Sequence, residues 1–184
     1  MAPIDTASLR ARAKRAYEVG RFREALAFAV FVVPMVVLSL LVCRQPGLTG
    51  LGGSALLLLA IGFRWRGGAV GRAVMPGLLA GSVPLVLPVL LRSSGHCCIG
   101  GACWSICMLG CVAGGVLAGV AVGVAAQAEL ERRWTFLSAA TLIAGLSGLL
   151  GCAIVGAAGI AGMVISCVAS SVQVAVVARL RSVA

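Results

Sequence analysis

Charge is scarce in this sequence, and the long apolar stretches contain none. Only 5 of the 184 residues are acidic, one is a histidine, and Lys14 is the single lysine. Hydrophobic residues make up 61% of the chain and the mean hydropathy is +1.11, so too little polar sequence is left to cover a soluble core. The shortage excludes a soluble globular domain and predicts an all-α integral membrane protein.

The absence of ionisable side chains from the apolar stretches also limits what the protein can do. Proton-coupled pumps and ion pathways normally place Asp, Glu, Lys or Arg inside the membrane. One histidine and no carboxylate within the stretches leave no nucleophile–base–acid set. Cys97-Cys98 also lacks the CxxC spacing of a thioredoxin-like oxidoreductase. We therefore expect neither an enzyme nor a coupled transporter.

Six apolar stretches come close to the roughly 20 residues that a membrane-spanning helix needs. The second is short and opens with glycines, so a five-span chain with that stretch in the membrane interface stays open. Residues 134–178 contain no charge, a length that demands two helices joined by a turn, expected at 156–159. The sequence thus predicts a six-span bundle over residues 25–181, with spans 25–43, 47–63, 73–91, 104–126, 136–155 and 160–178.

The basic residues predict the orientation of the bundle. If the N-terminus is cytoplasmic, 13 of the 15 basic residues fall in cytoplasmic segments, and only Arg44 and Arg92 do not. The positive-inside rule predicts this asymmetry. We therefore expect both termini in the cytoplasm and a multi-pass protein of the inner (plasma) membrane. The net charge of +10 lies at the edges of apolar runs, which does not favour direct binding of nucleic acid.

Residues 1–24 precede the first span and form a predicted basic cytoplasmic helix, capped by Asp5 or Thr6. Six basic against three acidic residues give this segment a net charge of +3. It could lie as a collar on anionic lipid headgroups, or it could be a docking helix for a cytoplasmic partner. The residues at loose helical spacing that would contact such a partner are Leu9, Arg12, Ala13, Ala16 and Tyr17.

Small residues recur at every fourth position in the last three spans. Lipid tails remove most of the hydrophobic drive for helix association, so close packing must supply it. Rows of this spacing form the ridges along which helices pack, and we expect these spans to form a compact bundle. In a structural subunit of a larger complex, the glycine rows would instead be docking faces. The helix-packing residues are Cys107, Cys111, Gly115, Gly119, Gly123, Gly148 and Gly162.

Two prolines in the third span affect its backbone hydrogen bonds. Pro84 and Pro88 carry no N–H, so they leave the carbonyls of Ala80 and Pro84 without their helical donors. A kink beside a cavity and simple tolerance in a packed bundle are both consistent with this pattern.

All eight cysteines fall in the predicted outer half or an outer loop. Some, above all Cys107, Cys111 and Cys167, could serve as small hydrophobes at helix contacts. Others could form a redox pair or disulfide, because oxidation is permitted outside the cytoplasm. Eight cysteines allow 105 complete pairings, so the sequence does not choose among them. The candidates for redox chemistry are Cys97, Cys98, Cys103, Cys152 and Cys43.

A metal site is the third interpretation of the cysteines. His96 stands beside Cys97 and Cys98, with Cys103 one short loop away. Soft thiolates suit copper(I), zinc and heavier thiophilic ions, although the spacing is not that of a closed zinc site. The corresponding function would be a small mercury- or copper-type membrane carrier or binder, with a thiophilic metal ion as its ligand.

The layout of spans and cysteines resembles the bacterial membrane anti-sigma factors of the NrsF type. Gly101-Ala102-Cys103-Trp104 matches the place of one cysteine of that family, and Leu149-Leu150-Gly151-Cys152 matches the other. The likeness covers roughly residues 21–181. It implies a membrane-embedded regulator whose N-terminal segment holds a cytoplasmic sigma factor and releases it when the outer cysteines are oxidised or bind metal. Here the N-terminus is shorter and the cysteines exceed a pair.

Overall fold

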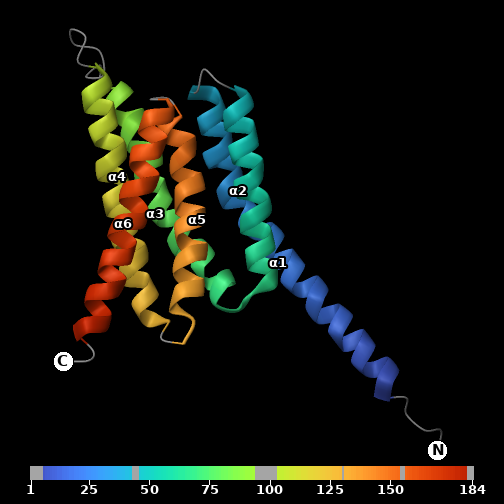
Figure 1. The fold of residues 1–184 in the computed structure, drawn as a ribbon. Helices are drawn as coiled ribbons and strands as arrows, with labels where there is room; N and C mark the ends of the chain where they lie inside the picture. The colour runs from blue at the N-terminus through green and yellow to red at the C-terminus, as the bar shows by residue number, and fades with distance from the viewer. Residues whose placement is uncertain (1–5, 43–45, 94–102, 130, 154–155, 182–184) are drawn as a thin grey trace, which may run out of the picture.

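A computed structural model describes residues 6–42, 46–93, 103–129, 131–153 and 156–181 of the chain (Figure 1). Each of the six long helices in these ranges is long and apolar enough to cross a membrane, and no described residue is in a strand. The chain is therefore all-helical with six candidate spans. The elements are α1 (Thr6–Val42), α2 (Pro46–Arg66), α3 (Gly68–Ser93), α4 (Cys103–Ala125), the 3-10 turn η2 (Ala126–Ala128), α5 (Arg133–Cys152) and α6 (Ala157–Arg181).

The second and fifth spans differ in length and position from the prediction. Helix α2 is 21 residues long, so the stretch that looked short is long enough to cross a membrane. Helix α5 ends at Cys152 and α6 begins at Ala157, so the chain turns about three residues before the expected site. Gly156 has a φ of +96°, a conformation that glycine adopts without strain, and it stands directly before α6.

The basic N-terminal segment and the first span form one helix rather than two. Helix α1 continues for 37 residues with Pro34 inside it. Its junction, residues 21–25, contains Arg, Glu and Ala, which favour helix, and no proline interrupts it. We call residues 6–22 the arm. Every side chain from residue 12 to residue 20 is exposed, and the arm extends obliquely beyond the rest of the bundle (Figure 1).

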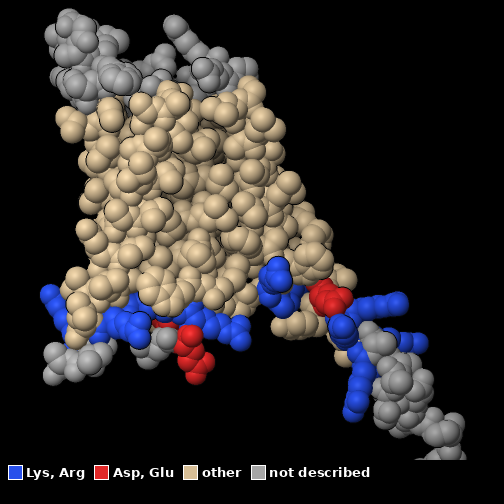
Figure 2. All heavy atoms as spheres, viewed as in Figure 1, with Lys and Arg blue, Asp and Glu red and all other residues tan. Residues whose placement is uncertain are grey.

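Basic side chains gather at one end of the molecule (Figure 2). We call this the basic end, and the other the opposite end. Helix α1 starts and α6 finishes at the basic end (Figure 1). There Arg72 Nη2 lies 3.0 Å from Glu129 Oε2, which ties the start of α3 to the connection between α4 and α5. The sides between the two ends expose large apolar residues such as Leu41 and Leu51, as a lipid-facing surface requires.

Helices α4 and α6 are packed backbone to backbone. A Cβ added at Gly115 would lie 2.5 Å from the carbonyl oxygen of Met163, and one at Gly119 would collide with the carbonyl oxygen of Cys167. Gly123 meets Val174 and Ser171 in the same way, and Gly162 meets Val112. The glycine row of α4 is therefore filled by α6 of the same chain.

Helix α5 has α3 as its most extensive partner, whereas the sequence suggested α4 and α6. A Cβ at Gly77 would lie 2.8 Å from the carbonyl oxygen of Ala140, and one at Gly81 would lie 2.8 Å from that of Ala144. The reason is a further row of small residues at spacing four, in α3: Ala69, Ala73, Gly77 and Gly81. The bundle thus contains two tight pairs, α3–α5 and α4–α6. We call the interface between the pairs the seam.

Three contacts fasten α1, at and just after the base of the arm, to the end of α2 and to the residue that follows it. The rings of Phe22 and Trp65 meet edge to face with centroids 5.9 Å apart. The Arg64 guanidinium lies 5.6 Å from the centroid of the Phe28 ring. The guanidinium of Arg21 packs against Gly67, the residue between α2 and α3. We call this set of contacts the clasp.

Replacing Gly67 by alanine is expected to loosen the clasp. Gly67 has a φ of +69°, where an L side chain is strained by roughly 1–2 kcal/mol, and its new methyl group would displace Arg21. Gly68 has a φ of +63° and open space around it. Gly68→Ala therefore has the same backbone strain as Gly67→Ala, but its new methyl group does not collide with Arg21. Limited proteolysis of the arm should be faster in Gly67→Ala than in Gly68→Ala. Equal rates would contradict the role of Arg21.

A candidate thiol site in the membrane bundle

Two cysteine thiols from different helices meet inside the bundle. Cys111 on α4 and Cys152 on α5 have no solvent-exposed surface, and they belong to one buried cluster. The sulfur of Cys152 also lies 3.9 Å from the carbonyl oxygen of Pro84 on α3. The pair therefore joins three helices at one point.

The acceptor on α3 exists because of a proline. In an α-helix the carbonyl of Pro84 would bond to the N–H of residue 88, but Pro88 has none. The S–H group of Cys152 donates to that carbonyl instead. Pro84 is itself fully buried, and a Cβ at Gly114 of α4 would lie 2.9 Å from its Cα, so α4 packs closely around the same point.

A third sulfur side chain completes this region. Met163 of α6 has no exposed surface and belongs to the same buried cluster as Cys111 and Cys152, with Ile160 packed against it. A Cβ added at Gly148, one turn before Cys152, would lie 3.0 Å from the Met163 sulfur. We call Cys111, Cys152 and Met163 the sulfur cluster. It crosses the seam, because α5 belongs to one tight pair and α4 and α6 belong to the other.

The small-residue rows explain why these side chains converge. Cys111 stands one turn before Gly115 in the row of α4, and Cys152 stands one turn after Gly148 in the row of α5. Cys152 is the last residue of α5, which runs from the basic end, so the cluster lies toward the opposite end.

The structure describes only some of the residues that the sequence predicted as site residues. Cys43, His96, Cys97 and Cys98 lie outside the described residues, as do the side chains of Leu9 and Cys103, whose backbones are helical. A Cys103–Cys152 link is therefore untested, and the described neighbour of Cys152 is Cys111. On the arm, the side chains of Arg12, Ala13, Ala16 and Tyr17 are all exposed.

Cys111 was predicted only as a helix-packing residue. The sequence contained only indirect evidence for a contact of Cys111 with Cys152. Pro88 leaves a carbonyl acceptor on α3, and the small-residue rows of α4 and α5 each carry a cysteine near the same end of the bundle. Cys107 is half-buried, while Cys167 is buried at the α4–α6 contact. Among the described residues, no group of three or more His, Cys, Asp or Glu side chains is placed to hold a metal ion.

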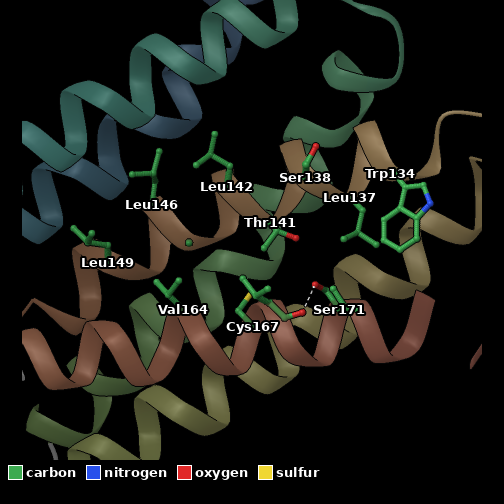
Figure 3. A pocket seen from close by; sticks show the side chains of 13 residues that line it. Trp134, Leu137, Ser138, Thr141, Leu142, Leu146, Leu149, Val164, Cys167 and Ser171 are labelled. Atoms are coloured by element: carbon green, nitrogen blue, oxygen red, sulfur yellow. Dashed lines mark hydrogen bonds between the residues drawn. The ribbon is translucent and has the colours of Figure 1, made fainter. Parts of the chain in front are cut away.

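An apolar groove runs between α5 and α6 (Figure 3). It has a volume of about 500 Å³ and extends along α5 from Trp134 to Leu149. Cys167 and Thr141 line it, and Ser171 donates its hydroxyl proton to the carbonyl of Val168 at 2.9 Å. No acidic or basic side chain lines it among the described residues, so its chemistry is that of a lipid-facing surface. The groove shows that α5 and α6 are packed less tightly than the two glycine-rich pairs.

No family model, curated protein or solved structure matches the chain. The geometry defines a class: a multi-pass membrane protein of six helices with an exposed basic arm at one end and a buried thiol pair toward the other.

Proposed function

We propose that the chain is a membrane-embedded regulator that holds a cytoplasmic protein on its arm and releases it when thiols near the opposite end react. The observation that carries this proposal is the arm. Its side chains are exposed on every face between residues 12 and 20, and it extends beyond the basic end (Figure 1). A helix without a packed face draws little stability from its surroundings. A bound partner would supply the missing face.

The surface chemistry of the arm suits an acidic protein partner. Residues 6–20 carry four basic side chains against Glu18 alone, together with exposed Tyr17 and Val19. A collar on lipid headgroups would be expected to turn across the basic end, whereas the arm continues the direction of α1 (Figure 1). The resemblance to NrsF-type anti-sigma factors names the partner as an extracytoplasmic-function sigma factor, so the regulator would act on transcription without binding nucleic acid itself.

The positions of the charges support the proposed orientation. All the basic side chains visible in Figure 2 lie at the basic end. By the positive-inside rule we assign that end to the cytoplasm. The proposal is then a protein of the inner membrane with its sulfur cluster in the outer half.

A route from the thiols to the arm exists through α5 and α2. A Cβ at Gly52 of α2 would lie 3.1 Å from a methyl carbon of Leu149, a neighbour of Cys152 on α5. The other end of α2 carries Trp65, which contacts the base of the arm. A reaction that shifts the seam can bias the arm through this path if the bundle has two arrangements of similar free energy.

Mild solubilisation and co-purification test the proposal. A sigma factor should co-purify with the chain and dissociate after treatment with an oxidant or a thiophilic metal, and it should be lost from a Tyr17→Ala variant. Recovery of large membrane subunits without a sigma factor would contradict the proposal in favour of a structural subunit. The glycine rows argue against that alternative, because α3, α4, α5 and α6 fill them within one chain.

A small carrier or binder for thiophilic metal is the second candidate, and the sulfur cluster is the observation that favours it. It predicts metal uptake or tolerance that depends on the cysteines and is unaffected by loss of the arm. A variant lacking residues 6–20 therefore separates the two functions: loss of regulation supports the regulator, and unchanged metal tolerance supports the carrier.

A further inference from the structure

We infer that Cys111, Cys152 and Met163 form an intramembrane site for one thiophilic divalent metal ion of the cadmium or mercury class. The site is separate from the loop cysteines considered above. It deepens the proposed function by naming its signal, and only that assignment as a signal rests on the proposed function. The binding itself depends on three sulfur side chains that come from three helices and are closed off from solvent.

The charge of the ion follows from the number of thiols. Binding replaces the two S–H protons by one divalent ion, so that M²⁺ and two thiols give a metal dithiolate and two protons. The product carries no net charge, which matters because an uncompensated charge is strongly disfavoured in a buried apolar site. A monovalent ion such as copper(I) would leave a net negative charge. Calcium and magnesium require several oxygen ligands, whereas this site offers sulfur.

The three side chains are already gathered in one buried cluster. Two sulfurs that each lie about 2.3 Å from one metal, as in zinc thiolates, are roughly 3.8 Å apart. When Cys152 loses its proton it also loses its hydrogen bond to Pro84, and that carbonyl oxygen then lies beside the cation. The thioether of Met163 supplies a third soft ligand from α6.

Cys107 lies one turn closer to the opposite end on α4 and is half-buried, so its thiol stands between that end and Cys111. The ion would join α4 and α6 of one tight pair to α5 of the other. Binding would therefore change the packing at the seam between the two pairs. The proposed regulation requires movement at this same interface.

Metal titration of purified protein in detergent tests the site. The starting variant keeps only Cys111 and Cys152, with serine at Cys43, Cys97, Cys98, Cys103, Cys107 and Cys167. Cadmium should bind at one ion per chain, with a thiolate-to-metal charge-transfer absorption and release of two protons. Adding Cys152→Ser should abolish the absorption. Met163→Leu, which nearly conserves volume, should weaken binding by about tenfold, the lower end of what loss of a supporting contact does at metal sites.

Two controls make the result decisive. A variant that keeps only Cys107 and Cys167 should show no such absorption. Removing residues 6–20 from the two-cysteine variant should leave cadmium affinity unchanged, because the arm lies at the basic end and the sulfur cluster lies toward the opposite end. The inference is overturned if the helical, monodisperse two-cysteine variant binds no cadmium or binds it no better than the Cys107–Cys167 control. Binding that fails to release a partner in the otherwise native chain would leave the site standing and contradict the proposed function instead.

Discussion

Deleting residues 6–20 is expected to abolish retention of the cytoplasmic partner while the six-helix bundle still assembles. The side chains of residues 12–20 are exposed, so their removal takes away the proposed docking surface and no core contact. Arg21 and Phe22 stay in the chain, which keeps the contacts of the clasp with Gly67 and Trp65. Arg21 loses only the Tyr17 ring, whose centroid lies 5.6 Å from its guanidinium carbon. The partner found with the membrane fraction should fall by at least about tenfold, equivalent to roughly 1.4 kcal/mol of binding free energy. Transcription from the dependent promoter should become independent of the signal.

A matched substitution distinguishes docking from general damage to α1. Tyr17→Ala removes an exposed ring on the arm, and Val30→Ala removes an equally exposed side chain on the apolar part of the same helix. Only Tyr17→Ala should weaken retention. Full retention by the chain without residues 6–20 would show that the arm is not the docking surface.

Gly119→Ala is expected to destabilise the bundle by about 2 kcal/mol, within the range for overpacked cores. The new methyl group would collide with the carbonyl oxygen of Cys167 and with the hydroxyl of Ser170. A backbone carbonyl cannot rotate away, so α4 and α6 must move apart and lose contacts along their length. Thermal unfolding in detergent, followed by circular dichroism or by aggregation, measures the loss.

Gly145 provides the matched control on α5. A Cβ there meets nothing within 4 Å, because Gly145 lines the apolar groove. Gly145→Ala should be neutral or stabilising, since alanine favours helix over glycine by roughly 1 kcal/mol. If the two variants unfolded at the same temperature, close contact at Gly119 would not be what holds α4 to α6.

The sequence predicted the spans well because the membrane imposes a strong pattern. Long uncharged stretches and flanking arginines locate six helices, including the two between residues 134 and 178. The continuity of α1 was not predicted, although residues 21–25 favour helix, because the change from polar to apolar composition at Ala25 was interpreted as a boundary between two segments. The sequence did not predict the pairing of α5 with α3, because several helices carry rows of small residues and a row does not specify its partner. The row of α3 consists of Ala69, Ala73, Gly77 and Gly81.

The thiol site was harder to predict, because a contact between distant residues depends on which helices pair. Cys152 stood among the redox candidates and Cys111 among the packing residues, and spacing alone gives no reason to join them. The proline pattern did predict an open carbonyl at Pro84, and the structure shows the Cys152 thiol donating to it. The loop cysteines and His96 lie outside the described residues, so their proposed redox and metal roles stay predictions.

Labelling with a membrane-impermeant maleimide tests most directly whether the arm and the loop cysteines face opposite sides of the membrane. One variant keeps Cys97 and Cys98 as its only cysteines, and another carries Glu18→Cys on the arm in a cysteine-free background. In cells whose outer envelope has been made permeable and whose inner membrane is intact, Cys97 and Cys98 should react and residue 18 should react only after lysis. Reaction at residue 18 before lysis, with Cys97 and Cys98 protected, would contradict the proposed regulator.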